Sequence, residues 1–261
     1  MSPFLSVVIP AYNEAARLPR NLPQVAAYCA ALALPAPGGW EVLAVVERST
    51  DGTLEKARVA AAGFPETSVL DNGPQRGKGH AVRAGMLRAA GEVVLFMDAD
   101  LSTPLAEVAR FLAHFEAHPE TDVLIGNRRH PGSRIGRPQG WLRRSLSALY
   151  SRLVQRRVLG GAWADTQCGF KAFRRAAARE IFSRQRLDGF SFDVEVLALA
   201  AGLGLRVADL PVEWCDDRAT RLNLWRDGWT MLRDLWRVRS LVARSLREQP
   251  ATSLAARARG H

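Results

Sequence analysis

Hydrophobic positions follow two different periods along the first half of the chain. Short apolar runs rich in β-branched residues predict strands at Leu5–Pro10, Trp40–Val46, Thr67–Leu70, Val93–Met97 and Asp122–Asn127. Between the strands, apolar residues recur every three or four positions, which predicts helices at Ala15–Leu34, from Ser49 through Ala62, from Arg76 to Ala90 and at Pro104–His118. This β–α alternation predicts an α/β fold: a doubly wound, mostly parallel sheet with helices on both faces.

The second half of the chain has a less regular pattern. It predicts a basic helix at Gly140–Leu159, a short strand or loop at Asp165–Phe173, helices at Arg175–Phe182 and Phe192–Leu203, a strand at Leu205–Trp214 and a long helix at Leu222–Glu248. No linker is clean enough to separate two domains. We therefore expect one α/β domain over residues 1–220, a C-terminal amphipathic helix over 221–248 and a flexible tail over 249–261.

Two acidic residues stand at the end of the most apolar strand. Val93–Met97 runs directly into Asp98 and Asp100, and Ser102-Thr103-Pro104 then gives a helix-start signal. Ligands bind at the carboxyl ends of strands in open α/β sheets, and two carboxylates this close are costly without a cation between them. Oxygen ligands of this kind suit Mg²⁺ or Mn²⁺. The alternative is that both acids only cap the next helix.

Composition limits the class of protein. Hydrophobic residues make up 48% of the 261 positions, which is enough for a sizeable core. The three cysteines are far apart, which argues against a disulfide framework or a zinc site and suits a reducing compartment. The N-terminus lacks a signal-peptide pattern, and no apolar window is long enough to span a membrane. We expect a soluble or peripheral protein.

The net charge of +10 is concentrated in two stretches. Residues 123–164 contain nine arginines and no acid, and residues 221–261 contain nine arginines against three acids. Basic stretches of this kind attract phosphates, nucleic acid or an anionic membrane surface. Composition does not choose among these partners.

Five segments carry a recognisable combination of motifs: SVVIPAYNEAARL (Ser6–Leu18), RGKGHAVRAGML (Arg76–Leu87), FMDADLSTP (Phe96–Pro104), DTQCGFKAF (Asp165–Phe173) and FDVEVL (Phe192–Leu197). Together they resemble glycosyltransferase family 2, the inverting group with the GT-A fold, and more narrowly its dolichyl-phosphate β-glucosyltransferases and their bacterial relatives. Each segment alone is a weak signal, whereas their order and spacing are specific, and DTQCGFK discriminates best. The resemblance extends from about Ser6 to about Leu241.

The resemblance implies that the segments in the first half of the chain bind a nucleotide-sugar donor. The donor-binding residues it implies are Pro10, Ala11, Tyr12, Glu14, Glu47, Ser49, Lys78, Asp98 and Ala99, with Tyr12 at the base and Glu14 near the ribose. Asp98 and Asp100 would hold the metal ion that bridges the diphosphate. The second strand ends in Val46-Glu47-Arg48-Ser49, which lacks one of the family's acids and puts donor selectivity in doubt. A simple glycine turn is the alternative reading of the residues around Lys78.

The later segments are implied to bind the sugar and the acceptor. Arg128 and Arg143 or Arg144 match family positions that clamp phosphates, and Gln167 and Lys171 are candidates at the sugar or acceptor phosphate. Asp193 and Glu195 would point the same way on a strand but about 200° apart on a helix, so we expect only one of them to bind sugar hydroxyls. The alternative for that pair is a structural acid beside an arginine.

The function that follows is a metal-dependent, inverting transfer of a hexose, expected to be glucose from UDP-glucose, to a polyprenyl phosphate. A phosphate acceptor is largely dianionic at pH 7 and needs no general base, which fits the lack of a Ser/His/Asp or Cys/His set. GDP-mannose as donor or a non-lipid acceptor is the close rival. A nucleic-acid or anionic-surface binding module is a remote one, because it would need neither the acids nor the glycine motif.

The C-terminal helix is where we expect contact with a membrane. Residues 222–242 combine tryptophans and leucines with arginines, a composition typical of interfacial helices. We therefore expect a cytoplasmic protein that is peripheral at the cytoplasmic membrane face. A core-packing helix with a charged outer side is the equal alternative.

Overall fold

The computed structural model describes residues 2–35, 39–137, 154, 158–215 and 224–248, with side chains in the last segment described from Thr230 onward. Most of the predicted basic helix Gly140–Leu159, with Arg143 and Arg144, lies outside the described residues, as does the tail 249–261. The predicted boundary at residue 220 falls in the undescribed range 216–223, so the division into domain and helix stays a prediction.

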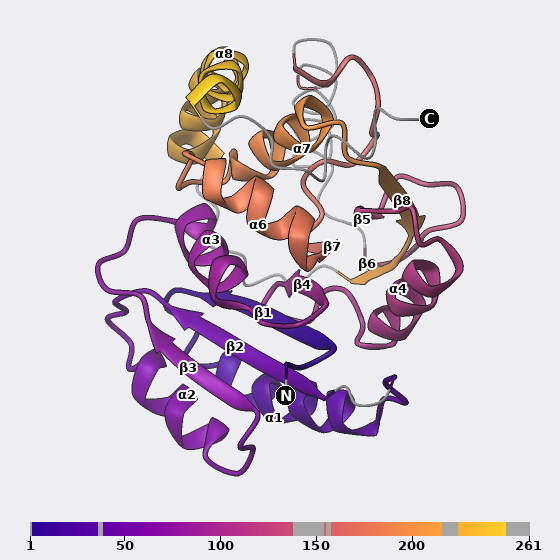
Figure 1. Ribbon diagram of the computed structural model, residues 1–261. Helices are drawn as coiled ribbons and strands as arrows, with labels where there is room; N and C mark the ends of the chain where they lie inside the picture. Colours follow the sequence, from indigo (N-terminus) through magenta and orange to yellow (C-terminus); the bar gives the residue numbers. More distant parts are fainter. Residues whose placement is uncertain (1, 36–38, 138–153, 155–157, 216–223, 249–261) are drawn as a thin grey trace.

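A seven-stranded sheet forms the centre of the molecule (Figure 1). Its strands, in spatial order, are β3 (Thr67–Asp71), β2 (Trp40–Val46), β1 (Leu5–Ala11), β4 (Val93–Met97), β7 (Phe170–Arg174), β5 (Val123–Asn127) and β8 (Val207–Pro211). All neighbours pair in parallel except β7, which lies antiparallel between β4 and β5. The prediction of a mostly parallel sheet is confirmed, and the segment left open as strand or loop enters the middle of that sheet.

The predicted strand Leu205–Trp214 is divided in two. β8 ends at Pro211, and the chain then forms β9 (Glu213–Cys215), which pairs with β6 (Arg134–Arg137) in a separate two-stranded sheet. Proline has no backbone N–H to continue a ladder, so the break occurs at Pro211.

Alternate side chains of the strands face two apolar layers. Val7 and Ile9 of β1 pack in one layer, with helices α1 (Leu18–Ala31), α2 (Thr53–Ala61) and α4 (Ala106–Ala117). Val8 packs in the other layer, with α3 (Lys78–Arg88), α6 (Arg175–Arg184), α7 (Phe192–Gly202) and α8 (Leu224–Glu248). Helices therefore cover both faces, as the pattern predicted (Figure 1).

Helix α8 lies against α7 and α6. Leu235, Val238 and Val242 on its inner side are buried in the same apolar layer as those helices. Its outer side keeps Trp236 73% exposed. The core-packing alternative therefore holds for the inner side, and Trp236 on the outer side is exposed.

Candidate active site

The acidic turn follows β4 at the carboxyl edge of the sheet. Ala99 is buried, and its carbonyl accepts a hydrogen bond from Asn21 Nδ2 of α1 at 2.8 Å. Leu101 has a φ of 55°, a left-handed conformation that turns the chain sharply after the acids. The hydrogen bond to the Ala99 carbonyl and the left-handed conformation of Leu101 together define the turn that carries the two acids.

Asp98 receives a direct ion pair from the start of α3. Lys78 Nζ lies 2.5 Å from Asp98 Oδ1. Burial opposes the charge on Lys78, but Asp98 and Asp193 outweigh it and raise the pKa of the ammonium group. Burial and the neighbouring charge of Asp98 raise the pKa of Asp100, whose Oδ1 accepts a hydrogen bond from the Ser102 N–H at 2.9 Å. The two carboxylates are close enough to repel each other.

A second buried pair lies beside the first. Lys171 of β7 is fully buried, and its Nζ donates to Asp193 Oδ1 at 2.5 Å and to the carbonyl of Cys168 at 2.6 Å. The same ammonium lies 5.3 Å from the ring centroid of Phe96. Lys171 was a candidate at the sugar or acceptor phosphate, and the structure turns its ammonium group inward onto Asp193.

Together these groups form what we call the charged cluster: Lys78, Asp98, Asp100, Lys171 and Asp193. It joins the loop after β4 to β7 and to the N-terminal ends of α3 and α7. The structure therefore brings five of the predicted site residues into one electrostatic unit.

Glu195 does not join the charged cluster, although it is only two residues from Asp193. Because both residues lie on helix α7, they point in different directions. The buried Glu195 carboxylate accepts hydrogen bonds from the backbone N–H groups of Arg186 and Leu187, at 2.9 and 2.7 Å. Burial raises the pKa of Glu195 to about 7. Its contacts are those of a group that orders the loop before α7.

Glu47, one of the expected donor-binding residues, is bound to the protein's own backbone. It is 1% exposed and accepts hydrogen bonds from the backbone N–H groups of Arg76 and Gly77, at 3.1 and 3.0 Å. Its Oε1 also lies 3.0 Å from His80 Nδ1. The carboxylate thus orders the glycine loop that carries Lys78.

The loops after β1 and β2 are tied to each other. Ser49 Oγ accepts a hydrogen bond from the Asn13 N–H at 3.0 Å and donates one to the Glu47 carbonyl at 2.8 Å. The Glu14 carboxylate receives both Nε and a terminal nitrogen of Arg17, at 2.5 and 2.6 Å. Tyr12 is 38% exposed just beyond the buried Pro10 and Ala11. These loop contacts explain why α1 begins at Leu18 and not at the predicted Ala15.

Arg128 is paired with an acid that the sequence analysis did not select. Its Nε and a terminal nitrogen lie 2.7 and 2.8 Å from the two oxygens of Asp165, and its guanidinium lies 5.4 Å from the centroid of the Trp214 ring. The opposing charge of Arg128 overcomes the effect of burial and lowers the pKa of Asp165 to about 2. The same carboxylate accepts a hydrogen bond from the backbone N–H of Gln167 at 3.2 Å.

The remaining expected ligand, Gln167, has a buried side-chain Nε2 without a hydrogen-bond partner among the residues that the structure covers. Cys168 beside it is fully buried, and burial raises the pKa of its thiol to about 11. A buried thiol that keeps its proton is a poor nucleophile.

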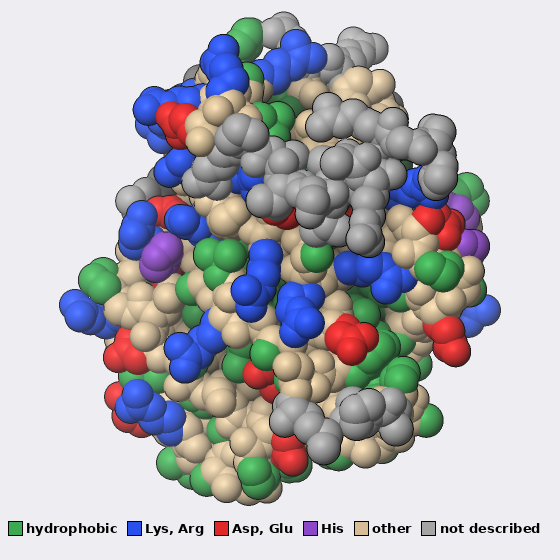
Figure 2. All heavy atoms as spheres, viewed as in Figure 1, with side chains coloured by type: hydrophobic (Ala, Val, Ile, Leu, Met, Phe, Trp, Pro, Cys, Tyr) green, Lys and Arg blue, Asp and Glu red, His purple; other side chains and the backbone are tan. Residues whose placement is uncertain are grey.

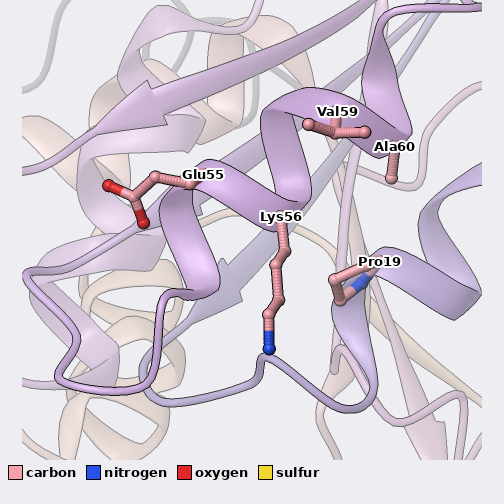
Figure 3. A pocket seen from close by; sticks show the side chains of 5 residues that line it. All are labelled: Pro19, Glu55, Lys56, Val59 and Ala60. Carbon is pink, nitrogen blue, oxygen red and sulfur yellow. The ribbon is translucent and has the colours of Figure 1, made fainter.

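Surface features lie apart from this site. A shallow hollow of about 400 Å³ lies over α1 and α2 (Figure 3), and none of the predicted site residues lines it. Basic side chains gather over α8, at the upper left of Figure 2. Across the described helices, none is long and apolar enough to cross a bilayer.

The family model for "Glycosyl transferase family 2" matches residues 6–182. The chain belongs to glycosyltransferase family 2. This family 2 enzyme is 34% identical over 241 residues to "Dolichyl-phosphate beta-glucosyltransferase" of Drosophila melanogaster, covering 90% of the chain and 74% of the relative. It is 31% identical over 242 residues to the human protein of that name, with the same coverage.

Solved structures support the fold of the enzyme. Glucosyl-3-phosphoglycerate synthase from Mycobacterium tuberculosis, in complex with Mn²⁺, UDP and phosphoglyceric acid, superposes with a TM-score of 0.64 at 18% identity, covering 92% of this chain and 78% of that one. Mannosyl-3-phosphoglycerate synthase from Rubrobacter xylanophilus gives 0.62 at 20% identity, with 96% and 77% covered. The expected GT-A fold is confirmed.

Three residues that contact the site were not selected from sequence. Asp165 and Gly169 lie inside the DTQCGFKAF segment, from which only Gln167 and Lys171 were selected. A Cβ atom on Gly169 would lie 2.0 Å from Asp98 Oδ2, so this glycine makes room for the acid. The third is Asn21, which donates a hydrogen bond to the acidic turn. Its only indication in the sequence is that a polar residue stands among the apolar positions of the helix.

Proposed function

We propose that the enzyme transfers glucose from UDP-glucose to a polyprenyl phosphate and inverts the configuration at C1. The observation that carries the proposal is the charged cluster, whose Lys78, Asp98 and Asp100 meet at the carboxyl edge of the sheet. Such an edge is where α/β folds bind nucleotides. The relatives that match about 90% of the chain are named dolichyl-phosphate β-glucosyltransferases, which supports the sugar and the acceptor class.

Asp98 and Asp100 fit a divalent metal ion, Mg²⁺ or Mn²⁺. Their carboxylates repel each other, and the pKa of Asp100 is raised by burial and by Asp98, so a cation between them would relieve that repulsion. Within the described residues no set of three or more metal-binding side chains occurs, so substrate phosphate and water would complete the coordination. When bound, the ion would neutralise charge on the departing diphosphate.

The chain's own residues then act by binding and orientation. Tyr12 would contact the base, and Asp193, held by Lys171, would accept hydrogen bonds from the sugar hydroxyls. An oxygen of the acceptor phosphate attacks C1 while the bond from C1 to the nucleoside diphosphate breaks on the opposite side, so the anomer is inverted. The acceptor oxygen is already ionised, so no residue has to remove a proton. Catalysis rests on positioning and electrostatics.

Binding of the acceptor phosphate requires basic side chains that are not already paired with acidic side chains of the protein. Arg128 is bound to Asp165, so we infer that it shapes the acceptor side through Asp165 and Trp214. Arg143 and Arg144 stay predicted phosphate ligands, because they lie outside the residues described.

A transfer assay with UDP-glucose, GDP-mannose and other nucleotide sugars tests the proposal, with short polyprenyl phosphates or soluble phosphates as acceptors. We expect UDP-glucose with a polyprenyl phosphate to give a β-linked product, and EDTA or Asp100→Ala to abolish it. Turnover that survives both changes would refute the metal assignment. A preference for GDP-mannose or a soluble acceptor would replace the substrates and keep the reaction type.

We also propose that the outer side of α8 contacts the cytoplasmic face of a membrane. Trp236 is 73% exposed and Leu232 is 38% exposed, and the side chain of Arg233 between them is 68% exposed. Tryptophan and leucine beside arginine favour an anionic interface. Trp225 and Trp229, which the sequence also indicated, have no described side chains.

Co-sedimentation with vesicles of phosphatidylglycerol and phosphatidylcholine tests the membrane contact. The variant Trp236→Ala/Arg233→Gln is expected to lose most binding to the anionic vesicles. Its control, Val59→Ala/Arg88→Gln, removes an exposed apolar side chain and a positive charge elsewhere on the surface. Equal sedimentation of the two variants would exclude this surface.

A further inference from the structure

Lysine is rare in this chain, and its positions are unusual. Of 36 basic residues only three are lysines, at positions 56, 78 and 171. Lys56 is exposed on α2, whereas Lys78 and Lys171 each pair with an acid of the charged cluster. An ammonium group is a compact point charge, while a guanidinium is a wide planar fork. Both lysines of the charged cluster therefore place a compact cation beside a carboxylate.

The backbone around Lys78 is held firmly on both sides. Glu47 binds the N–H groups of Arg76 and Gly77. A Cβ atom on Gly77 would lie 2.6 Å from the Asp188 carbonyl oxygen, and one on Gly79 would lie 2.5 Å from the Leu187 carbonyl oxygen, so both glycines pack directly on the loop before α7. The movable part is thus the long side chain of Lys78, and its anchor is rigid.

Lys78 occupies the acid that a metal ion would need. Its Nζ lies 2.5 Å from Asp98 Oδ1, and the Asp98 carboxylate also lies directly against Gly169. A divalent ion at Asp98 and Asp100 would be very close to this ammonium, and like charges at such a distance repel strongly. Metal ion and ammonium therefore compete for Asp98.

We propose that Lys78 is an exchangeable counter-ion, which neutralises Asp98 before substrates bind and passes to the donor diphosphate when the metal ion takes its place. This inference rests on the metal-dependent reaction proposed above. It makes Lys78 a positioning residue for both ligands. When the metal ion binds alone, it displaces the Lys78 ammonium group from Asp98 and leaves that group without a new partner. When a diphosphate binds together with the metal ion, the diphosphate becomes the new partner of Lys78. Metal and nucleotide should therefore bind with positive coupling, and the coupling should depend on Lys78.

Binding of Mn²⁺, followed by the electron paramagnetic resonance signal of the free ion, tests this with and without UDP. In Lys78→Gln we expect the Kd for Mn²⁺ alone to fall about tenfold, since no charge-assisted hydrogen bond has to be broken. The gain in Mn²⁺ affinity on adding UDP should shrink by a similar factor. Lys78→Arg keeps the charge and should retain weak binding of Mn²⁺ alone. Lys56→Gln removes the same charge at a distance and should bind as the unaltered enzyme does.

The outcomes separate this inference from the proposed function. If Mn²⁺ binds with UDP but the affinity for Mn²⁺ alone is the same in Lys78→Gln and in the unaltered enzyme, or undetectable in both, the counter-ion role is refuted and the metal site stands. If Lys56→Gln tightens Mn²⁺ binding as much as Lys78→Gln, the effect is general electrostatics and the inference again fails. If Mn²⁺ binds none of the proteins even with UDP, the metal-dependent function itself is refuted.

Discussion

The backbone of Gly169 lies directly against the carboxylate of Asp98. A Cβ atom at position 169 would lie 2.0 Å from Asp98 Oδ2 and 2.5 Å from its Cγ. Gly169 is not among the glycines with a positive φ, so its conformation is open to other residues. Space, and not backbone freedom, is therefore what this position requires.

Gly169→Ala should displace the carboxylate of Asp98 without unfolding the enzyme. A displacement of about 1 Å at a reacting site costs on the order of 100-fold in rate, and we expect a loss of kcat/KM of that size. Measured transfer rates and the Tm together check this. Gly63→Ala is the matched control, because a Cβ there meets nothing within 4 Å, and it should leave both quantities unchanged. Full activity of Gly169→Ala would contradict the close contact.

Asp165→Asn should remove a pH-dependent part of the stability. Because the folded pKa of Asp165 is about 2, below its ordinary value of 3.8, the pair with Arg128 stabilises the protein above about pH 4 and is lost as the pH falls toward 2. A shift of this size corresponds to about 2 to 3 kcal/mol. Urea unfolding at pH 5 and at pH 3 should show a smaller difference in Asp165→Asn than in the unaltered enzyme.

The comparison for this measurement is Asp71→Asn, which removes an exposed carboxylate at the end of β3. Its unfolding free energy should follow that of the unaltered enzyme at both pH values. If Asp165→Asn did the same, the Arg128–Asp165 pair would have no role in acid sensitivity.

The two acids of α7 should differ in their effect on transfer. Asp193→Asn removes the anionic partner of the buried Lys171 and changes the charged cluster, so we expect kcat/KM to fall about 100-fold or more. Glu195→Gln acts on the loop backbone at Arg186 and Leu187 and should change kcat/KM by less than about tenfold at pH 6. Steady-state rates for both variants decide this, and a larger loss for Glu195→Gln would reverse the assignment.

Glu195 should also make stability fall with rising pH. Burial raises its folded pKa to about 7, above the ordinary 4.5, so the folded state keeps its proton longer than the unfolded chain. The stabilisation is complete below about pH 4 and is lost as the pH rises through about 7, by about 3 kcal/mol in all. Glu195→Gln cannot ionise, so its unfolding free energy should change less between pH 5 and 8. Parallel curves for the two proteins would exclude this role.

Much of the fold could be predicted because its signals are local. Val93–Met97 is a continuous apolar run, and the structure has a strand with those bounds. The acids after it were predicted to lie at the ligand-binding edge, because strand direction alone decides which end carries the following loop. The strand predicted at Trp40–Val46 also has the predicted bounds, because it too is a mostly apolar run.

The sequence by itself therefore determined the α/β layering, the family and the segments that meet at one edge. Only the tertiary structure decided which charged groups pair: Lys78 with Asp98, Lys171 with Asp193, and Arg128 with Asp165, 37 positions away. It also turned Glu47 toward the glycine loop and Glu195 away from the charged cluster. Hydrophobic periods are set by neighbours along the chain, whereas an ion pair depends on the direction and distance of two side chains that only packing brings together.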